Sequence, residues 1–170
     1  LLISSIAEHA EKFHGDREIV SVTMDNPRHR YTMRESVKRA RQLANALGNL
    51  GLNRGDRVAT IAWNDYRHLE VYYAVSGAGQ VCHTINPRLF PEQLIFIINH
   101  AEDRWIFTDL MFVPLLEKLL PHIANVEGFV VMTDEANMPE TSLPNAVCYE
   151  TMLAAESDDY DWPQFDERTA

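Results

Sequence analysis

Apolar and polar residues alternate with two different periods in the first third of the chain. In residues 3–13 the apolar positions recur every three or four residues, which predicts an amphipathic helix that Gly15 can end. In Val20–Met24 alternate positions are apolar, which predicts a half-buried strand. Asp25–Pro27 predicts a turn into a second short strand at His29–Tyr31. The chain is therefore expected to begin with a helix and a hairpin.

The next helix carries the strongest start signal in the sequence. Thr32 and Glu35 have the spacing of a capping box, in which each side chain hydrogen-bonds the backbone amide of the other residue. An apolar stripe follows at helical spacing, formed by Met33, Val37, Ala40, Leu43, Ala44, Leu47 and Leu50. Gly51 stands where a helix-ending glycine is expected. We expect exposure for the basic residues that fall mainly outside the stripe, Arg34, Lys38, Arg39 and Arg41.

After Gly51, short apolar runs alternate with segments of helical periodicity. The runs begin at nearly equal spacing, near Val58, Val81, Trp105 and Phe129. The helical segments between them lie at 66–78, 92–101 and about 111–120. Strands and helices that alternate with short connections form βα units, whose strands pair in parallel. The sequence therefore predicts an α/β fold with a mostly parallel sheet flanked by helices.

The order of these elements divides the chain into three segments. Residues 1–51 hold the first helix, the hairpin and the long helix, and residues 55–133 hold the βα sheet layer. Residues 134–170 hold a loop with two prolines, a short helix at Tyr149–Ala155 and an acidic connector. The total of 170 residues, with 46% hydrophobic and 24% charged, suits one domain or one large piece of a domain.

The charge of the chain argues against nucleic acid as a partner. The net charge is −10, whereas phosphate binding along a nucleic acid requires a concentrated positive surface. Eight of the 15 Lys and Arg residues lie between Arg28 and Arg57, and ten of the 25 acids lie between Asp134 and Glu167. We interpret the basic stretch as a solvated helix face and the acidic stretch as a connector.

Two cysteines and the absence of a long apolar run indicate the compartment. Cys82 and Cys148 are far apart and form no C-x-x-C pattern, which favours a reducing environment. No apolar run in the sequence is long enough to span a bilayer, and the opening segment lacks the basic leader of a signal peptide. We therefore expect a cytoplasmic protein, with peripheral membrane association left open.

Most motifs that carry chemistry can be rejected. Ser76 lies in "AVSGAG", which lacks the first glycine of a nucleophile elbow and ends a helix instead of following a strand. The sequence contains no G-x-x-x-x-G-K-[ST] phosphate loop. Its seven histidines never pair at i, i+3 or i+4, so a helical metal face is not expected.

The stretch "HTINPRLFPEQL" carries the one pair of candidate site residues. Val81–Ile85 is predicted as a parallel strand, so Asn86 and Arg88 follow its carboxyl end, where open α/β sheets gather ligands. Pro91 suits the first turn of the next helix, and Glu92 is favourable at the positive end of that helix. Asn86 and Arg88 are therefore the substrate-site candidates of this chain.

Two blocks of the sequence resemble a known enzyme family. "YTMRESVKRARQLANALGNLGLNRGDRVATIAWN" is similar to the early helix, loop and strand of the adenylate-forming acyl-CoA synthetases. "HLEVYYAVSGAGQVCHTINPRLFPEQLIFIINHAEDRWIFTD" resembles the block that follows in that family. The segment His-Thr-Ile-Asn-Pro-Arg-Leu is most similar to the medium- and long-chain fatty-acyl-CoA ligase branch of the family. The resemblance covers the chain from about Ile19 to Ala170.

The resemblance implies an activity for a longer protein. Enzymes of this family use ATP and Mg²⁺ to convert a carboxylate into an acyl-adenylate, and the thiol of coenzyme A then displaces AMP. The family's phosphate loop, its ribose-binding acid and its mobile lysine have no match in the 170 residues. The resemblance thus implies the N-terminal piece of a fatty-acyl-CoA synthetase, inactive by itself. We expect this piece to contain no catalytic, cofactor-binding or metal-binding residue, while the full-length enzyme would bind fatty acid, ATP, Mg²⁺ and CoA.

Two other functional classes are compatible with alternating βα units. One is a self-contained flavodoxin-like binding or interaction module, and the other is a scaffold whose basic face between Arg28 and Arg57 docks an acidic partner. If the chain is a fragment, it should carry apolar surface that its parent would cover. Exposed patches of that kind tend to associate, so we expect a homo-oligomer.

Overall fold

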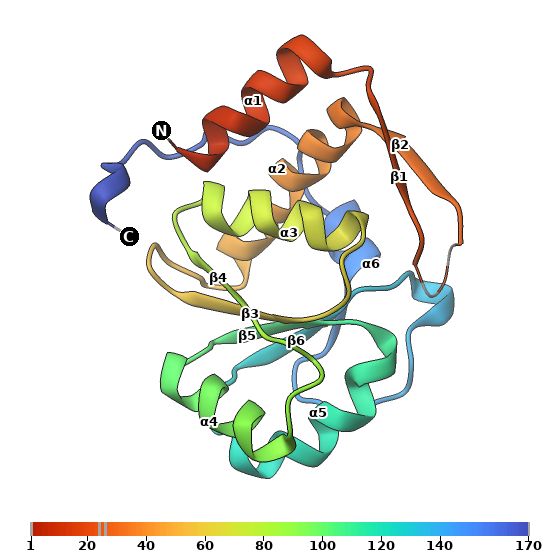
Figure 1. Ribbon diagram of the computed structural model, residues 1–170, viewed down its shortest axis with the longest axis vertical. Helices are drawn as coiled ribbons and strands as arrows, with labels where there is room; N and C mark the ends of the chain where they lie inside the picture. Colours follow the sequence, from red (N-terminus) through yellow and green to blue (C-terminus); the bar gives the residue numbers. More distant parts are fainter. Residues whose placement is uncertain (1, 24, 26, 170) are drawn as a thin grey trace. The chain divides into compact units, whose positions relative to one another are not determined.

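The chain folds into two compact units in the computed structural model, which describes residues 2–23, 25 and 27–169 (Figure 1). The first unit comprises Leu1–Gly55, Asn64–Val81 and Met152–Ala170. The second unit comprises Asp56–Trp63 and Cys82–Thr151. Each unit is thus assembled from segments that are far apart in the sequence. The division into 1–51, 55–133 and 134–170 stays a prediction.

The first unit contains three helices and a two-stranded hairpin. Its helices are α1 (Ile3–His14), α2 (Met33–Asn49) and α3 (Tyr66–Gly77), its strands are β1 (Glu18–Ser21) and β2 (His29–Thr32), and a short 3-10 turn, Glu167–Thr169, lies near the end of the chain. The strands pair antiparallel, from Glu18 opposite Thr32 to Ser21 opposite His29. This pairing sets the limits of β1, so the prediction of a strand over Val20–Met24 was wrong in its boundaries. Met24 and Asn26, parts of the predicted strand and turn, lie outside the described residues.

Helix α2 has the caps and the buried stripe that the sequence predicts. The Glu35 amide donates to Thr32 Oγ1 at 3.3 Å, and the Thr32 amide donates to Glu35 Oε2 at 2.7 Å. The amide and the hydroxyl of Thr32 both donate to the Glu35 carboxylate, and these two hydrogen bonds lower the pKa of that carboxyl. The stripe is buried at Val37, Ala40, Leu43, Ala44 and Leu47. Gly51 ends the helix region at φ +77°, a conformation that glycine adopts without a steric cost.

The basic residues of α2 correct one expectation. Arg34 and Lys38 are exposed, as predicted, but Arg39 and Arg41 are only 23% and 22% exposed. Arg39 Nε donates to Glu70 Oε1 at 2.8 Å, and the Arg41 guanidinium makes two hydrogen bonds to Glu11. The long aliphatic stems of these arginines cover apolar surface while their charged ends find partners, which a helical stripe does not reveal.

Helix α3 carries ionised side chains into the interior of the first unit. The side chains of Arg67 and Asp25 are each only 4% exposed and form an ion pair at 3.0 Å. The Arg67 guanidinium also lies 4.9 Å from the centre of the Tyr66 ring. The His29 ring stacks on the Tyr66 ring, with 3.5 Å between their centroids. The charges of this buried cluster are therefore compensated locally, as burial requires.

The end of helix α6 (Tyr149–Ala154) and the residues that follow it are attached to α2, mainly through their backbone. Three amide side chains of α2, at Gln42, Asn45 and Asn49, face this segment. Gln42 Nε2 donates to the carbonyls of Leu153 and Glu156, and Asn45 Nδ2 donates to the carbonyls of residues 157 and 159. Asn49 Nδ2 donates to the Glu156 carboxylate. We call residues 153–159 the strap.

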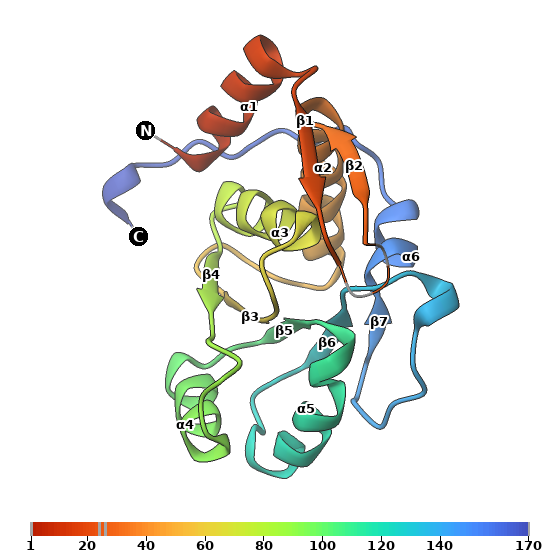
Figure 2. The same cartoon turned by 45° about the vertical axis from the view of Figure 1, so that its right-hand side comes forward.

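The second unit contains a five-stranded sheet with the order β4-β3-β5-β6-β7 (Figure 2). Its strands are β3 (Arg57–Ile61), β4 (Val81–Thr84), β5 (Trp105–Thr108), β6 (Gly128–Val131) and β7 (Val147–Cys148). β3, β5, β6 and β7 pair in parallel, beginning with Val58 opposite Trp105. The predicted α/β fold with a mostly parallel sheet is therefore confirmed, and four strands begin within one residue of the predicted positions.

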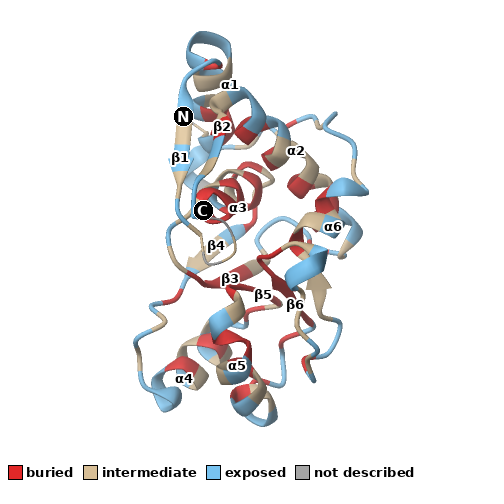
Figure 3. Ribbon diagram, turned by 90° about the vertical axis from the view of Figure 1, so that its right-hand side faces the viewer, coloured by how far each residue is buried: buried red, intermediate tan, exposed pale blue. Residues whose placement is uncertain are grey.

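Helices α4 (Pro91–Ala101) and α5 (Val113–Leu119) belong to the same unit and share a hydrophobic cluster with the sheet. The cluster includes Leu94 and Ile98 of α4, Leu116 of α5 and Phe129 of β6, all less than 2% exposed. The faces of α4 and α5 that point away from the sheet are exposed, as the colouring of Figure 3 shows. α4 begins at Pro91, one residue before the predicted range 92–101, and has Pro91 in its first turn as predicted. The helix predicted over 111–120 is α5 flanked by the 3-10 turns Leu110–Phe112 and Leu120–His122.

The sequence did not predict β7, which has only two residues. A strand this short offers no periodicity, and it is recognised only by its pairing with Val130 and Val131 of β6. The chain continues directly into α6 (Tyr149–Ala154), close to the short helix expected there. Within the described residues, no helix has the length and apolarity needed to cross a bilayer.

Candidate functional site

The carboxyl ends of β3, β4 and β5 lie together at one end of the sheet. The chain runs from β3 to β4 on one side, then crosses back to place β5 on the other side of β3. The junction between β3 and β5 is thus the topological switch point, where open α/β sheets bind ligands. We call the residues that follow these strands the strand-end site: Trp63, Asn86, Arg88, Asp109 and Met111.

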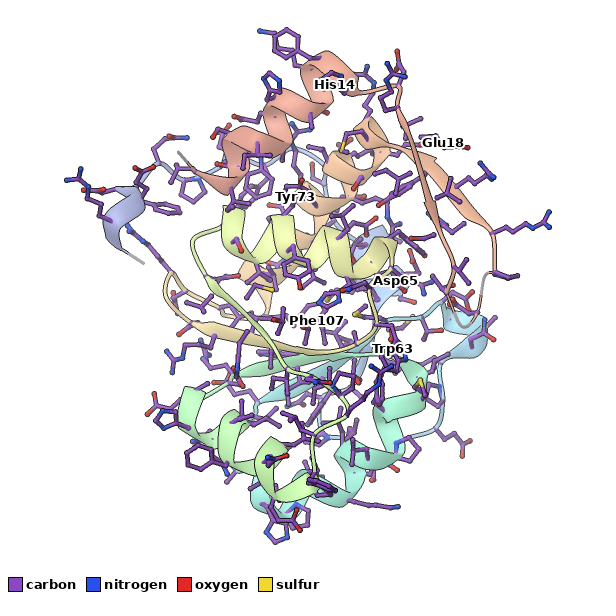
Figure 4. All side chains as sticks on the ribbon, in the orientation of Figure 1. His14, Glu18, Trp63, Asp65, Tyr73 and Phe107 are labelled. Carbon is purple, nitrogen blue, oxygen red and sulfur yellow. The ribbon has the colours of Figure 1, made fainter. Side chains whose placement is uncertain are left out.

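Asp109 joins the two strands of the switch point. It follows β5 directly, is 5% exposed, and donates its amide to the Ile61 carbonyl at the end of β3, at 3.3 Å. Its Oδ2 atom accepts a hydrogen bond from the Trp63 amide at 2.7 Å. The charge-assisted hydrogen bond to this buried carboxylate fixes the turn that carries Trp63, which Figure 4 labels at the end of β3.

Trp63 in turn supports the guanidinium of Arg88. Cζ of Arg88 lies 5.0 Å from the centre of the Trp63 ring, within the range of a cation–π contact. Asn86 Oδ1 accepts from the Arg88 amide at 3.0 Å, an Asx turn that holds the backbone of Arg88. When the face of a guanidinium lies against an aromatic ring, its N–H groups stay free at the edge of the guanidinium plane, where they can bind a carboxylate or phosphate.

An apolar rim adjoins this cation. Met111 is 48% exposed, and its Sδ atom lies 2.9 Å from Trp63 Nε1, which donates to it. The rings of Trp63 and Phe112 are 5.6 Å apart and tilted. The strand-end site therefore presents an exposed arginine beside an exposed thioether and a half-buried indole, a combination that suits an anionic ligand with an apolar part.

The strand-end site offers binding groups and no assembled catalytic set. Its residues include a cation, an amide and a carboxylate that is already hydrogen-bonded to a backbone amide. In the part of the chain that the structure describes, no three His, Cys, Asp or Glu side chains gather in a way that could hold a metal ion. The chemistry available here is the positioning of a ligand.

His83 and Cys82 of the same sequence stretch lie outside the strand-end site. His83 is within β4, and its Nδ1 is 2.8 Å from Oδ2 of the fully buried Asp103. Burial raises the pKa of the Asp103 carboxyl, and the hydrogen bond and charge of His83 oppose that rise. Burial also raises the pKa of the Cys82 thiol to about 12, which makes it unreactive at neutral pH. Both residues are partly buried within β4, before the carboxyl end where the strand-end site lies.

Both candidates from the sequence, Asn86 and Arg88, lie at the strand-end site, and their role in substrate binding stays a prediction. Sequence reasoning missed Trp63 and Asp109. Their positions in the sequence could have indicated them, because Trp63 lies two residues after the end of β3 and Asp109 lies one residue after the end of β5. Their mutual hydrogen bond, which spans 46 positions of the chain, has no sequence pattern.

The sequence and the fold of this chain are similar to those of known proteins. A family model described as AMP-binding enzyme matches residues 6–165. A medium-chain-fatty-acid–CoA ligase of Ectopseudomonas oleovorans is 48% identical over 170 residues, which are all of this chain and 31% of that protein. A long-chain-fatty-acid–CoA ligase of Thermus thermophilus is 43% identical over 151 residues, covering 89% of this chain and 27% of that protein. The chain therefore spans about a third of the length of these relatives.

A 3-methylmercaptopropionyl-CoA ligase of Ruegeria lacuscaerulensis is equally similar, with 48% identity over all of this chain and 32% of that protein. Among solved structures, an anthranilate CoA ligase in complex with anthranoyl-AMP matches with a TM-score of 0.82 over 96% of this chain and 30% of that one. A Mycobacterium tuberculosis fatty acyl CoA synthetase matches with a TM-score of 0.74 over 94% of this chain and 29% of that one. Both are 18% identical to this chain and support the fold alone.

Proposed function

The chain belongs to the AMP-binding enzyme family, and from this premise we propose that it is the N-terminal part of an ATP-dependent fatty-acyl-CoA synthetase. The observation that carries the proposal is the 48% identity to a medium-chain-fatty-acid–CoA ligase along the whole chain. The alternative of a self-contained flavodoxin-like module has no support. The strand order does not distinguish the two, because flavodoxin-like sheets have the same order.

The proposed reaction has two steps. A fatty-acid carboxylate oxygen attacks the α-phosphorus of ATP, which releases pyrophosphate and gives an acyl-adenylate. The thiolate of CoA then attacks the acyl carbon, the thioester forms, and AMP leaves. This chain is proposed to contribute substrate positioning to that reaction, and the catalytic groups are assigned to other parts of the full-length protein.

Mg²⁺ is the metal that the family implies, and the described residues do not fit it. The metal prefers several carboxylate oxygens in octahedral geometry together with substrate phosphates. No such cluster of acidic side chains is formed within residues 2–23, 25 and 27–169. No step of the reaction is therefore assigned to a metal site in this chain. ATP and CoA are likewise proposed as ligands of the full-length enzyme only.

ATP–pyrophosphate exchange on the full-length protein tests the proposed activity. With fatty acids of graded chain length, we expect exchange that depends on the acid, with a maximum among medium or long aliphatic chains. Exchange with no added acid, or none with any fatty acid, would contradict the proposal. The assay isolates the adenylation step, because pyrophosphate returns to ATP only through the acyl-adenylate.

Within this proposal, Asn86 and Arg88 line a substrate site. Support comes from the position of Arg88 at the carboxyl end of the sheet and from its stacking on Trp63. Both ATP and CoA carry phosphates, and the planar guanidinium of arginine binds phosphate with two hydrogen bonds. Asn86 is assigned a positioning role, because its side chain holds the Arg88 amide.

Replacement of Arg88 by alanine in the full-length protein should lower kcat/KM for CoA or ATP about tenfold, the effect of one lost charge-assisted hydrogen bond. Arg88→Lys keeps the charge and loses the planar stack, so it should recover only part of the loss. Arg30→Ala, which removes an exposed arginine of β2, is the control and should leave both constants unchanged. Unchanged constants for both substrates in Arg88→Ala would remove Arg88 from the site.

The homo-oligomer remains a proposal, supported by large apolar side chains on the surface. Phe90, Phe96 and Val22 are 73%, 65% and 73% exposed. Surface of this kind favours association. Light scattering over a range of protein concentrations should therefore give a mass above 19.5 kDa that rises with concentration. A constant monomer mass at high concentration would contradict the proposal.

A cytoplasmic location also remains a proposal. Cys82 and Cys148 are both free thiols, which suits a reducing compartment. The question of peripheral membrane association can be examined with the vesicle experiment described below.

A further inference from the structure

A hollow of about 320 Å³ lies where α1 ends and α2 begins, within the first unit. It is lined by residues 12–17 and by Arg34. His14, labelled in Figure 4, stands at the end of α1 beside this hollow. None of these residues belongs to the strand-end site or to the second unit.

The floor of the hollow is held by backbone hydrogen bonds. The Arg34 amide donates to the Gly15 carbonyl at 2.9 Å, and the Met33 amide donates to the Arg17 carbonyl at 2.8 Å. The Arg17 amide donates to the His14 carbonyl at 2.9 Å. The turn after α1 is thereby fixed to the first turn of α2, so the backbone that carries the lining side chains is preorganised.

Gly15 makes room for a cation in this floor. A Cβ atom at Gly15 would lie 2.6 Å from Arg34 Nη2 and 2.5 Å from the Glu11 carbonyl oxygen. Any other residue at this position would displace the guanidinium. The missing side chain therefore lets Arg34 lie directly against the backbone of the turn.

The hollow is positively charged on a chain whose net charge is −10. Lys12, Arg17 and Arg34 carry three positive charges around it, His14 adds an imidazole, and Asp16 is the one carboxylate among the lining residues. Asp16 is 96% exposed and lies 3.3 Å from Arg34, an arrangement that water screens effectively. With the imidazole counted as neutral, the lining keeps a net charge of +2.

Nearby acids are committed to other partners. Glu11 binds Arg41, and Glu18 binds Arg30 at 2.6 Å. Among the described residues, neither Lys12 nor Arg17 forms an ion pair with a carboxylate; Lys12 instead lies 5.2 Å from the Phe13 ring centre. Lys12 and His14 lie in the last turn of α1, where basic residues are stabilised by the negative end of the helix dipole, so a role in that helix accounts for their positions. It does not explain Arg17 and Arg34, which lie beyond that helix.

We propose that this hollow binds a phosphate group. Several cations around a preformed concavity match a compact dianion, which they can surround with charge-assisted hydrogen bonds. The group can come from a free phosphate ester or from the headgroup of a lipid. Phe13, 60% exposed at the rim, suits the second source, since an aromatic ring beside cations can enter a membrane interface.

The test uses the full 170-residue chain, inorganic phosphate as the probe, and sodium chloride at matched ionic strength as the reference. Amide NMR signals of Gly15, Asp16 and Arg17 should shift saturably with phosphate. Arg17→Gln should weaken the affinity about tenfold through the loss of one charge-assisted contact. Arg30→Gln removes the same charge from the exposed pair with Glu18 and should leave the affinity unchanged. Matching spectra of the variants away from the hollow establish that each retains the fold.

A second arm identifies the source of the phosphate. Vesicles of phosphatidylcholine with and without phosphatidic acid are sedimented with the chain. Saturable phosphate binding without capture by vesicles supports the site and assigns it to free phosphate esters. Capture that needs phosphatidic acid and is lost in Arg17→Gln supports the site and assigns it to a lipid headgroup. Shifts that sodium chloride reproduces, or phosphate affinity that is equal in Arg17→Gln and the unsubstituted chain, would overturn the proposal. Both arms are independent of acyl-CoA synthesis.

Discussion

Replacement of Arg67 by methionine should lower the free energy of unfolding by about 3–5 kcal/mol, the range seen when one partner of a buried ion pair is removed. Arg67 and Asp25 are each 4% exposed, so the variant would leave the Asp25 carboxylate buried without its cation. Urea denaturation followed by circular dichroism measures the change. The loss should appear as a lower midpoint with little change in slope.

The pH dependence of this variant tests the electrostatic origin of the loss. Burial acts to raise the pKa of Asp25, but hydrogen bonds from Arg67 and Thr23 hold it below its ordinary value. Without Arg67 the raising effect dominates, and a group with a raised folded-state pKa loses stability as the pH rises through that pKa. The difference between variant and unsubstituted chain should therefore shrink as the pH falls toward about 4, where an aspartate begins to protonate.

Two further variants serve as controls. Asp25→Asn combined with Arg67→Met removes both charges and should recover at least half of the lost stability, because an uncharged pair costs far less to bury. Arg30→Met breaks the exposed pair with Glu18 and should cost less than about 1 kcal/mol. A double variant no more stable than Arg67→Met alone would show that packing, and not charge, accounts for the loss.

Phe129→Ala should lower the free energy of unfolding by a similar amount, about 3–5 kcal/mol, through a cavity in the second unit. Phe129 is fully buried in β6 and belongs to the cluster that joins the sheet to α4 and α5. The neighbouring backbone has little freedom to close the cavity, since a Cβ at Gly128 would already lie 2.5 Å from the Trp105 ring. Thermal unfolding, followed by calorimetry, measures the effect.

The matched control is the same substitution on the surface. Phe96 lies on α4 and is 65% exposed, so Phe96→Ala removes the same atoms without leaving a cavity and should change stability by less than about 0.5 kcal/mol. Phe129→Leu, which conserves most of the volume, should cost less than about 1.5 kcal/mol. Equal losses in Phe129→Ala and Phe96→Ala would contradict the burial that the structure assigns to Phe129.

The elements that could be predicted from the sequence are those specified by local interactions. α2 begins at its capping box because Thr32 and Glu35 are three residues apart and satisfy each other's amides. β3, β5 and β6 are buried at every position except Arg57, so their sequences are mostly apolar, with Thr60 and Thr108 as the buried polar residues. α4 begins at Pro91, whose missing N–H is not needed in a first turn.

What could not be predicted depends on partners far away in the chain. The ion pair of Arg67 with Asp25 spans 42 positions, and Arg39 meets Glu70 across 31. At the strand-end site, Arg88 could be proposed because it follows a strand. Trp63 and Asp109 form a hydrogen bond because β3 and β5 are neighbours in the sheet, and the sequence does not state that strand order. Periodicity reveals which face of an element is buried, and it does not reveal which side chains meet there.

The attachment of the strap to α2 determines where along this contact sequence changes are tolerated. Residues 153, 156, 157 and 159 are bound to α2 through their carbonyl oxygens, which every amino acid possesses. Leu153 is buried, and the carboxylates of Glu156 and Asp158 bind Asn49 and Lys38. The other side chains of the strap can drift among variants with little effect on attachment. Gln42 and Asn45 have no such freedom, because their amide groups supply the donors. Tolerance to substitution should be high on the strap and low on the helix it crosses, although the two surfaces form one contact.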